Sequence, residues 1–218
     1  MLLSSVLRVF FRLLYHSFAW SYDLVSAAVS LGRWNDWVRS VVDLLGGGPV
    51  LELGHGPGHL QVTMRQRGLQ AYGIDESLQM GWQARRSIRR HGGEARLARA
   101  HAEGLPFPAE SFGTVVATFP TEYIFAQTTL AEVMRVLKPG GSLVVLFGAW
   151  PGGKGFADRA IAWLYRITGQ LPPEPEMLER LAAPIEAAGF DARSKWIRRD
   201  STDLFVLCGT KQIRLTKT

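Results

Sequence analysis

Three glycines at alternate positions form the segment of this chain best suited to chemistry, because they expose backbone to a ligand. Gly54, Gly56 and Gly58 follow a short apolar run that contains one acid, Glu52. Glycine tolerates positive φ angles and carries no side chain, so a ligand can lie directly against the main chain. The residues after this turn are typical of a helix, whose first N–H groups would point at electron-rich ligand atoms. The pattern predicts a buried strand, a ligand-binding turn and a helix.

The spacing of the glycines separates two classes of cofactor. A dinucleotide site requires G-x-G-x-x-G, and the third glycine of that motif would fall at His59. The chain instead has E-x-G-x-G-x-G, which resembles the S-adenosylmethionine (SAM) loop of class I methyltransferases. The resemblance implies that Glu52 orients the loop or reaches the methionine amine. It also implies that Gly54 and Gly56 admit the methionine part of the cofactor.

An acid ends the second predicted strand. Asp75 closes the stretch 69–75, directly before a predicted helix. In doubly wound sheets, ligands bind beyond the carboxyl ends of the strands, where a carboxylate can accept hydrogen bonds from both ribose hydroxyls. We therefore expect Asp75, with Glu76 beside it, to bind the cofactor.

The segment 101–107 resembles the loop after the third strand of small-molecule methyltransferases, in which an acid-small-acid-x-Leu-Pro-Phe run flanks the adenine. His101 replaces the first acid, whereas Ala102 and Glu103 match the family pattern. A neutral imidazole nitrogen can accept a hydrogen bond from the adenine amine. We therefore expect His101, Ala102 and Glu103 to bind the cofactor. Gly113 is a second departure, because the family usually has an aspartate there.

A fourth stretch, E-V-M-R-V-L-K-P-G-G-S-L-V-V-L at 132–146, resembles part of the methyltransferase group that includes the ubiquinone and menaquinone C-methyltransferases. Lys138 and Pro139 are expected to end a helix, and Gly140 and Gly141 to turn the chain into the fifth strand. The four motifs occur in the family's order over residues 22–148. The resemblance therefore implies a methyltransferase that binds SAM and releases S-adenosylhomocysteine.

The elements that position these motifs alternate along the chain. Strands are predicted at 50–53, 69–75, 95–100 (an edge strand), 114–119, 142–148, 190–199 and 202–209, and helices at 35–45, 60–67, 76–91, 127–137, 155–167 and 175–188. This order predicts an α/β fold: a doubly wound, mostly parallel, seven-stranded Rossmann-like sheet with a C-terminal antiparallel hairpin. The 218 residues suit one domain, 1–218. Residues 1–45 would form a helical N-terminal lid, from which Tyr22 covers the cofactor.

Residues 1–20 are apolar and aromatic, with Arg8, Arg12 and His16 on one helix face. Two arginines inside the segment argue against a transmembrane span, and it lacks the form of a signal peptide. Two interpretations stay open: a helix packed over the domain, or an interfacial helix on a membrane. A single cysteine, Cys208, excludes a disulfide framework and a cysteine-based zinc site, so we expect no metal. We expect a cytoplasmic protein, with membrane association as the alternative.

The acceptor is predicted to be a small apolar or aromatic metabolite, such as a quinone-precursor-like phenol. Aromatic residues are frequent in the predicted lid and at Phe119, Tyr123 and Phe125, and Phe119 is also expected to contact the cofactor. A base-methylating enzyme would have Asn/Asp-Pro-Pro-aromatic where this chain has T-F-P-T at 118–121, so we expect no nucleic-acid substrate. The alternatives are a non-catalytic SAM-binding protein and a methyltransferase of a polar small molecule.

Two residues are catalytic candidates, because methylation of a protonated acceptor requires a base. His55 lies within the glycine loop, where we also expect it to contact the cofactor, and Tyr123 follows the fourth strand. The oligomeric state is not predicted by the sequence.

Overall fold

The computed structural model describes residues 33–152, 155, 159 and 175–212. Several predictions lie outside these residues. They are the amphipathic segment 1–20, the lid residue Tyr22 and nearly all of the helix predicted at 155–167.

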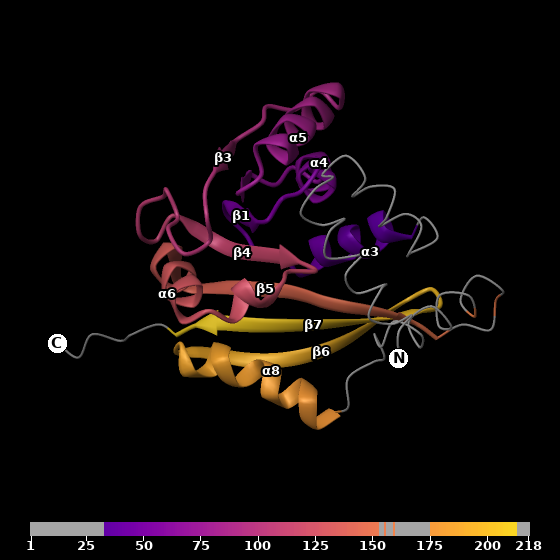
Figure 1. The fold of residues 1–218 in the computed structure, drawn as a ribbon, viewed down its shortest axis with the longest axis vertical. Helices are drawn as coiled ribbons and strands as arrows, with labels where there is room; N and C mark the ends of the chain where they lie inside the picture. Colours follow the sequence, from indigo (N-terminus) through magenta and orange to yellow (C-terminus); the bar gives the residue numbers. More distant parts are fainter. Residues whose placement is uncertain (1–32, 153–154, 156–158, 160–174, 213–218) are drawn as a thin grey trace, which may run out of the picture.

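The seven predicted strands form one sheet in the order β3-β2-β1-β4-β5-β7-β6 (Figure 1). Their bounds are β1 (Val50–Leu53), β2 (Ala71–Asp75), β3 (Leu97–Arg99), β4 (Phe112–Thr118), β5 (Leu137–Pro151), β6 (Phe190–Arg199) and β7 (Thr202–Lys211). Strands β1 to β5 pair in parallel, whereas β7 is antiparallel to both β5 and β6. The α/β class, the C-terminal hairpin and the edge position of the third strand are therefore confirmed.

The helices in the described part of the chain follow the predicted alternation. They are α3 (Trp34–Ser40), the 3-10 turn η2 (Val41–Leu44), α4 (His59–Gln66), α5 (Leu78–Arg90), η3 (Glu122–Phe125), α6 (Gln127–Val136) and α8 (Pro175–Ala187). In Figure 1, α8 runs along β6, and α4 and α5 lie at the opposite end of the molecule.

Two faces of the sheet are covered, as expected for parallel strands that are apolar throughout. Side chains alternate between faces along a strand. Leu51 and Leu53 belong to the core cluster that includes residues of α6 and α8, such as Val133 and Ile185. Val50 belongs to the second cluster, which contains residues of α3 and α4. All four residues of β1 are buried, so the strand that carries the glycine loop is fixed from both sides.

Several boundaries differ from the prediction by a few residues, and two of them have a clear cause. Helix α5 starts at Leu78 rather than at 76, because the Ser77 hydroxyl caps it by accepting a hydrogen bond from the Met80 N–H at 3.3 Å. Strand β5 starts at Leu137 rather than at 142, because Leu137 already pairs with Phe112. The predicted turn at 138–141 is thus an irregular part of the strand, where the pairing with β4 shifts register.

None of the helices in the described residues is long and apolar enough to cross a bilayer. Within the same residues, no group of three side chains is arranged to hold a metal ion.

Candidate functional site

The glycine loop leaves β1 at the carboxyl edge of the sheet, and its three glycines have three different neighbours. All have positive φ angles: 69° at Gly54, 51° at Gly56 and 91° at Gly58. A Cβ atom on Gly54 would lie 3.1 Å from the Tyr123 hydroxyl, and one on Gly58 would lie 3.0 Å from two atoms of Ala84 in α5. A Cβ atom on Gly56 would meet nothing within 4 Å. The bare backbone at Gly56 therefore faces open space, as close approach of a cofactor requires.

Asp75, at the end of β2, holds this loop through its backbone. One carboxylate oxygen accepts from the Gly56 N–H at 2.9 Å, and the other accepts from the Ser77 N–H at 2.8 Å. Each oxygen of an ionised carboxylate can accept a second hydrogen bond. Asp75 can therefore keep both backbone contacts and still accept bonds from ribose hydroxyls.

His55 is buried against the body of the protein and also bonds to the loop. Its Nδ1 lies 2.7 Å from the Gly56 carbonyl oxygen. Because a carbonyl only accepts, Nδ1 carries the proton in this contact. Burial lowers the pKa of His55 below its ordinary value. The ring packs beside β2, since a Cβ atom on Gly73 would lie 3.1 Å from His55 Cδ2.

Glu52 points from β1 toward α4, where it meets Gln61, a residue that the sequence analysis did not single out. The Gln61 side-chain amide donates to Glu52 and to the Tyr72 carbonyl, both at 2.9 Å. Glu52 is only 2% exposed, and burial raises its pKa to about 8, against the lowering effect of the Gln61 bond. The carbonyl oxygen of Gln61 has no hydrogen-bond partner. This buried pair beneath the loop is therefore uncharged and incompletely bonded at neutral pH.

The ends of β2 and β3 bring two further predicted residues, Glu76 and His101, into contact. Nδ1 of His101 lies 3.2 Å from a carboxylate oxygen of Glu76, and both side chains are 73% exposed. Ala102 is buried and Glu103 is exposed. His101 thus occupies an acid's place in the motif while contacting an acid on the neighbouring strand end.

The loop after β3 is held from α6 by two residues of the fourth motif. Arg135 donates to the carbonyls of Phe107 and Leu105, at 2.7 and 3.0 Å, and to the carboxylate of Glu132. Glu132 in turn accepts from the Leu105 N–H at 2.7 Å, and its hydrogen bond with Arg135 lowers its pKa. From the sequence, this motif predicts only a helix end and a turn, since the loop partners of the two side chains lie about thirty positions away in the chain. The E-x-x-R spacing is the one local signal that could have indicated the pair.

Aromatic rings gather at the carboxyl end of β4. The Phe119 ring lies 4.2 Å from that of Trp34 and 6.4 Å from that of Trp37, between centroids. Phe119 has φ +48°, a conformation that bulky residues rarely adopt and that costs about 1–3 kcal/mol. Its N–H donates to the Leu146 carbonyl at 2.7 Å, which fixes this conformation.

Tyr123 lies beside the loop, next to Gly54. Its hydroxyl donates to the Leu53 carbonyl at 3.4 Å. Burial raises the pKa of the Tyr123 phenol above its ordinary value, and the negative charge of Asp75 adds to the shift. The phenol is therefore protonated at neutral pH.

The structure thus places the loop, Asp75, the Glu76–His101 pair and Phe119 at successive strand ends of one sheet edge. Tyr22 lies outside the described residues. The contacts predicted between this set of residues and a cofactor stay predictions.

Comparisons with known proteins identify the family of this chain. A sequence profile described as a methyltransferase domain matches residues 50–141. Demethylmenaquinone methyltransferase of Thermus thermophilus is 33% identical over 195 residues, which cover 79% of this chain and 89% of that protein. Ubiquinone/menaquinone biosynthesis C-methyltransferase of Yersinia enterocolitica is 35% identical over 144 residues, covering 61% of this chain. The match spans about half (56%) of that second relative.

Solved structures share the fold. A candidate SAM-dependent methyltransferase from Methanococcus maripaludis gives a TM-score of 0.65 at 18% identity, covering 91% of this chain and 94% of its own. A phosphoethanolamine N-methyltransferase of Haemonchus contortus, solved with phosphomonomethylethanolamine and S-adenosylhomocysteine, gives 0.57 at 17% identity, covering 83% and 53%. At these identities the likeness concerns the fold alone.

Proposed function

This chain belongs to the SAM-dependent methyltransferases, and from that premise we propose that its acceptor is a small, uncharged, ring-containing metabolite of the quinone-precursor type. The cofactor is SAM and the product S-adenosylhomocysteine. We further propose that the methyl group goes to a ring carbon, since the name of the Yersinia relative states that it methylates carbon.

The observation that carries this proposal is the aromatic cluster at the carboxyl end of β4. Phe119 follows β4, on the side of β1 away from β2 and β3, and its half-buried ring packs on that of the half-buried Trp34, with the buried Trp37 6.4 Å away. A nucleoside would occupy the polar side, which leaves the aromatic side for the acceptor. A charged acceptor would lose its hydration against these rings without compensation, whereas an apolar ring would gain contact area.

The residues near the acceptor have little covalent chemistry to perform. Bound SAM supplies a methyl group that its sulfonium charge already activates. The protein has to hold the acceptor carbon in line with the S–CH3 bond, and such positioning accounts for most of the gain in methyl transfer. As the new C–CH3 bond forms, the S–CH3 electron pair returns to sulfur, and the ring carbon then loses a proton to water or to a base.

The two catalytic candidates fit different tasks. The Tyr123 hydroxyl is protonated, so it suits donation of a hydrogen bond to an acceptor oxygen, in exchange for its long bond to the Leu53 carbonyl, better than removal of a proton. His55 is neutral, but it is buried and bonded to the Gly56 carbonyl. We propose that His55 fixes the loop and that Tyr123 orients the acceptor. The membrane contact predicted for residues 1–20 stays a prediction, because those residues lie outside the described part of the chain.

A comparison of turnover with two panels of candidate acceptors tests the acceptor class. Labelled SAM is offered with a panel of hydrophobic phenols and, separately, with a panel of polar amines and acids. Turnover is expected with the phenols. Label found in the polar panel alone would support the alternative, a methyltransferase of a polar small molecule.

A further inference from the structure

The outer face of α5 combines exposed apolar side chains with two pairs of arginines. Leu78 is 48% exposed and Trp82 is 64% exposed. The arginine pairs, Arg85–Arg86 and Arg89–Arg90, lie in the C-terminal half of the helix. No acidic residue occurs anywhere from position 77 to 93.

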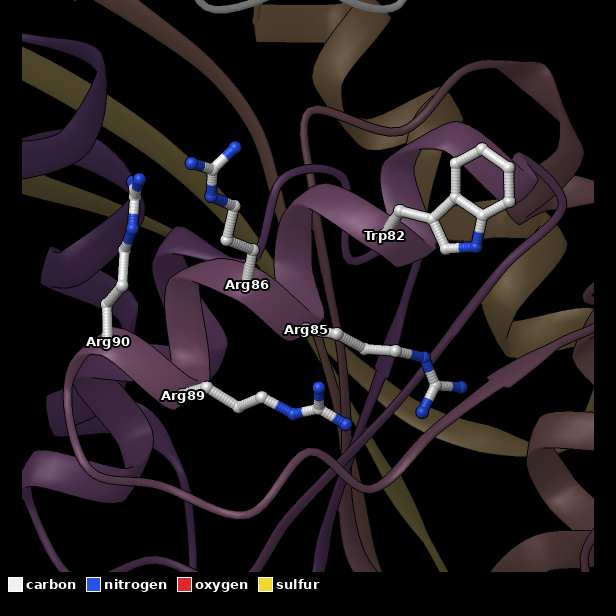
Figure 2. Close-up of a pocket in the computed structure, with 5 residues that line it drawn as sticks. All are labelled: Trp82, Arg85, Arg86, Arg89 and Arg90. Atoms are coloured by element: carbon white, nitrogen blue, oxygen red, sulfur yellow. The ribbon is translucent and has the colours of Figure 1, made fainter.

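These side chains point outward together. At 100° per residue, Leu78, Trp82 and the first three arginines fall within a sector of about 100° around the helix axis. Figure 2 shows Trp82 toward the N-terminal end, with Arg86 and Arg90 extending to one side and Arg85 and Arg89 to the other. Between them lies an open hollow of ≈ 530 Å³, which none of the predicted site residues lines.

The charges on this face are not balanced within the described residues. Arg85 is tied to the Leu97 carbonyl at 2.8 Å and supports β3. None of the ion pairs formed in the described part of the chain involves Arg86, Arg89 or Arg90. Arginines three and four positions apart repel one another, although the helix C-terminus favours cations in its last turn. Arg86 lies before that turn, so the face as a whole is arranged to meet negative charge.

We propose that this face of α5 docks on an anionic lipid surface. Tryptophan prefers the boundary between water and hydrocarbon, and arginine binds phosphate through its planar fork. Leu78 and Trp82 lie toward the N-terminal end of this face and the arginines toward its C-terminal end, so the face offers apolar contacts and phosphate contacts next to one another. A nucleic-acid backbone offers phosphates but no apolar layer to receive Leu78 and Trp82, and the lipid surface offers both.

Docking through α5 would also bring the site close to the lipid. The helix begins three residues after Asp75, so its apolar end lies at the carboxyl edge of the sheet. The inference rests on α5 alone and does not depend on the proposed acceptor.

The test is flotation of the full-length protein with phosphatidylcholine vesicles that contain or lack phosphatidylglycerol. Binding is expected only with phosphatidylglycerol, and it should weaken as salt is raised. The variant R86Q/R89Q/R90Q should lose affinity by on the order of 100-fold, since each arginine near an anionic surface contributes about fivefold. The variant W82S should weaken binding without changing its salt dependence. Retained SAM binding shows that each variant is folded.

A matched control removes three positive charges elsewhere. R193Q/K195Q/K138Q alters exposed residues of β5 and β6 and should float like the wild type. The proposal is wrong if the α5 variant floats as well as this control, or if the wild type does not float at all. It is also wrong if the α5 variant loses binding to duplex DNA but not to vesicles. Residues 1–20 are present throughout, so their contribution cannot produce the difference.

Discussion

At the residue scale, a substitution at Gly56 should affect SAM binding and protein stability to different extents. We expect Gly56→Ala to abolish measurable SAM binding, because a Cβ atom there would enter the open space that the cofactor needs. The protein itself should still fold, with a loss of about 1–2 kcal/mol from the positive φ angle. Calorimetric titration with SAM and thermal unfolding measure the two effects.

Gly68 provides the matched control. Its φ angle is +75°, and a Cβ atom there would also meet nothing within 4 Å, but it follows α4 at the opposite end from the loop. Gly68→Ala should cost similar stability and leave SAM affinity unchanged. Equal SAM affinity in the two variants would show that the glycine loop is not part of the SAM-binding site.

The buried Glu52 should make the stability of the protein depend on pH, and its burial sets the sign of that dependence. Its pKa is about 8 in the folded chain against 4.5 ordinarily, so folding favours the protonated form. The stability that this contributes is complete below pH 4.5 and is lost as pH rises to about 8. Relative to Glu52→Gln, the wild type should therefore lose on the order of a few kcal/mol of unfolding free energy across that range. Denaturant titrations at several pH values measure this difference. If the free energy of unfolding changes with pH in the same way in both proteins, the prediction is wrong.

The same carboxyl should couple SAM binding to pH. A cationic amine bound above the loop favours the ionised form of Glu52, so SAM binding should release a proton and strengthen with pH up to about 8. The slope is at most about tenfold per pH unit. Glu52→Gln should bind SAM without this slope. If the slope persists in the variant, another group is responsible.

Single residues differ in how far sequence alone could place them. The loop glycines and the position of Asp75 at a strand end could be predicted because each depends on neighbours along the chain, whereas the hydrogen bond between Gly56 and Asp75 could not. Gln61 could not, since its contact with Glu52 requires α4 to pack on β1. The positive φ angle of Phe119 likewise depends on a hydrogen bond to another strand.

At the scale of elements, the pair Glu132 and Arg135 connects α6 to the loop after β3. We expect Arg135→Lys to weaken SAM binding by about three- to tenfold, because lysine keeps the charge but cannot hold two carbonyls and a carboxylate at once. Hydrogen exchange at residues 101–107 should rise in the same variant.

An exposed pair serves as the comparison for this prediction. Arg193 bonds Asp191 at 3.2 Å on β6, far along the sheet from β3. Arg193→Lys should change neither SAM affinity nor exchange at 101–107. If Arg135→Lys speeds exchange but SAM affinity stays the same, the loop after β3 does not contribute to the site.

Most elements could be predicted because apolar runs and glycine or proline stops are local signals. Strands β1, β4, β6 and β7 and helix α6 fall within two residues of their expected bounds. The start of β5 was wrong because its first residue, Leu137, pairs with β4 across a register shift. Such pairing depends on a partner strand, so the residues around Leu137 alone do not predict it.

At the scale of the whole molecule, the strand order divides the sheet edge into two sides. The polar residues at the ends of β2 and β3 lie on one side of the glycine loop, and the aromatic cluster at the end of β4 lies on the other. The family resemblance could predict that these stretches meet at one edge. It could not show that Trp34 and Trp37 complete the apolar side, because α3 precedes all the motifs and reaches β4 only through folding.

The most direct test of the proposed function follows one methyl group from cofactor to acceptor. The protein is incubated with SAM carrying a 13C-labelled methyl group, together with a short-chain, reduced demethylnaphthoquinone and an equal amount of a polar amine. The products are then read by 13C NMR. We expect the label on a ring carbon of the quinol, with none on the amine. Label on the amine and none on the quinol would contradict the proposed acceptor class.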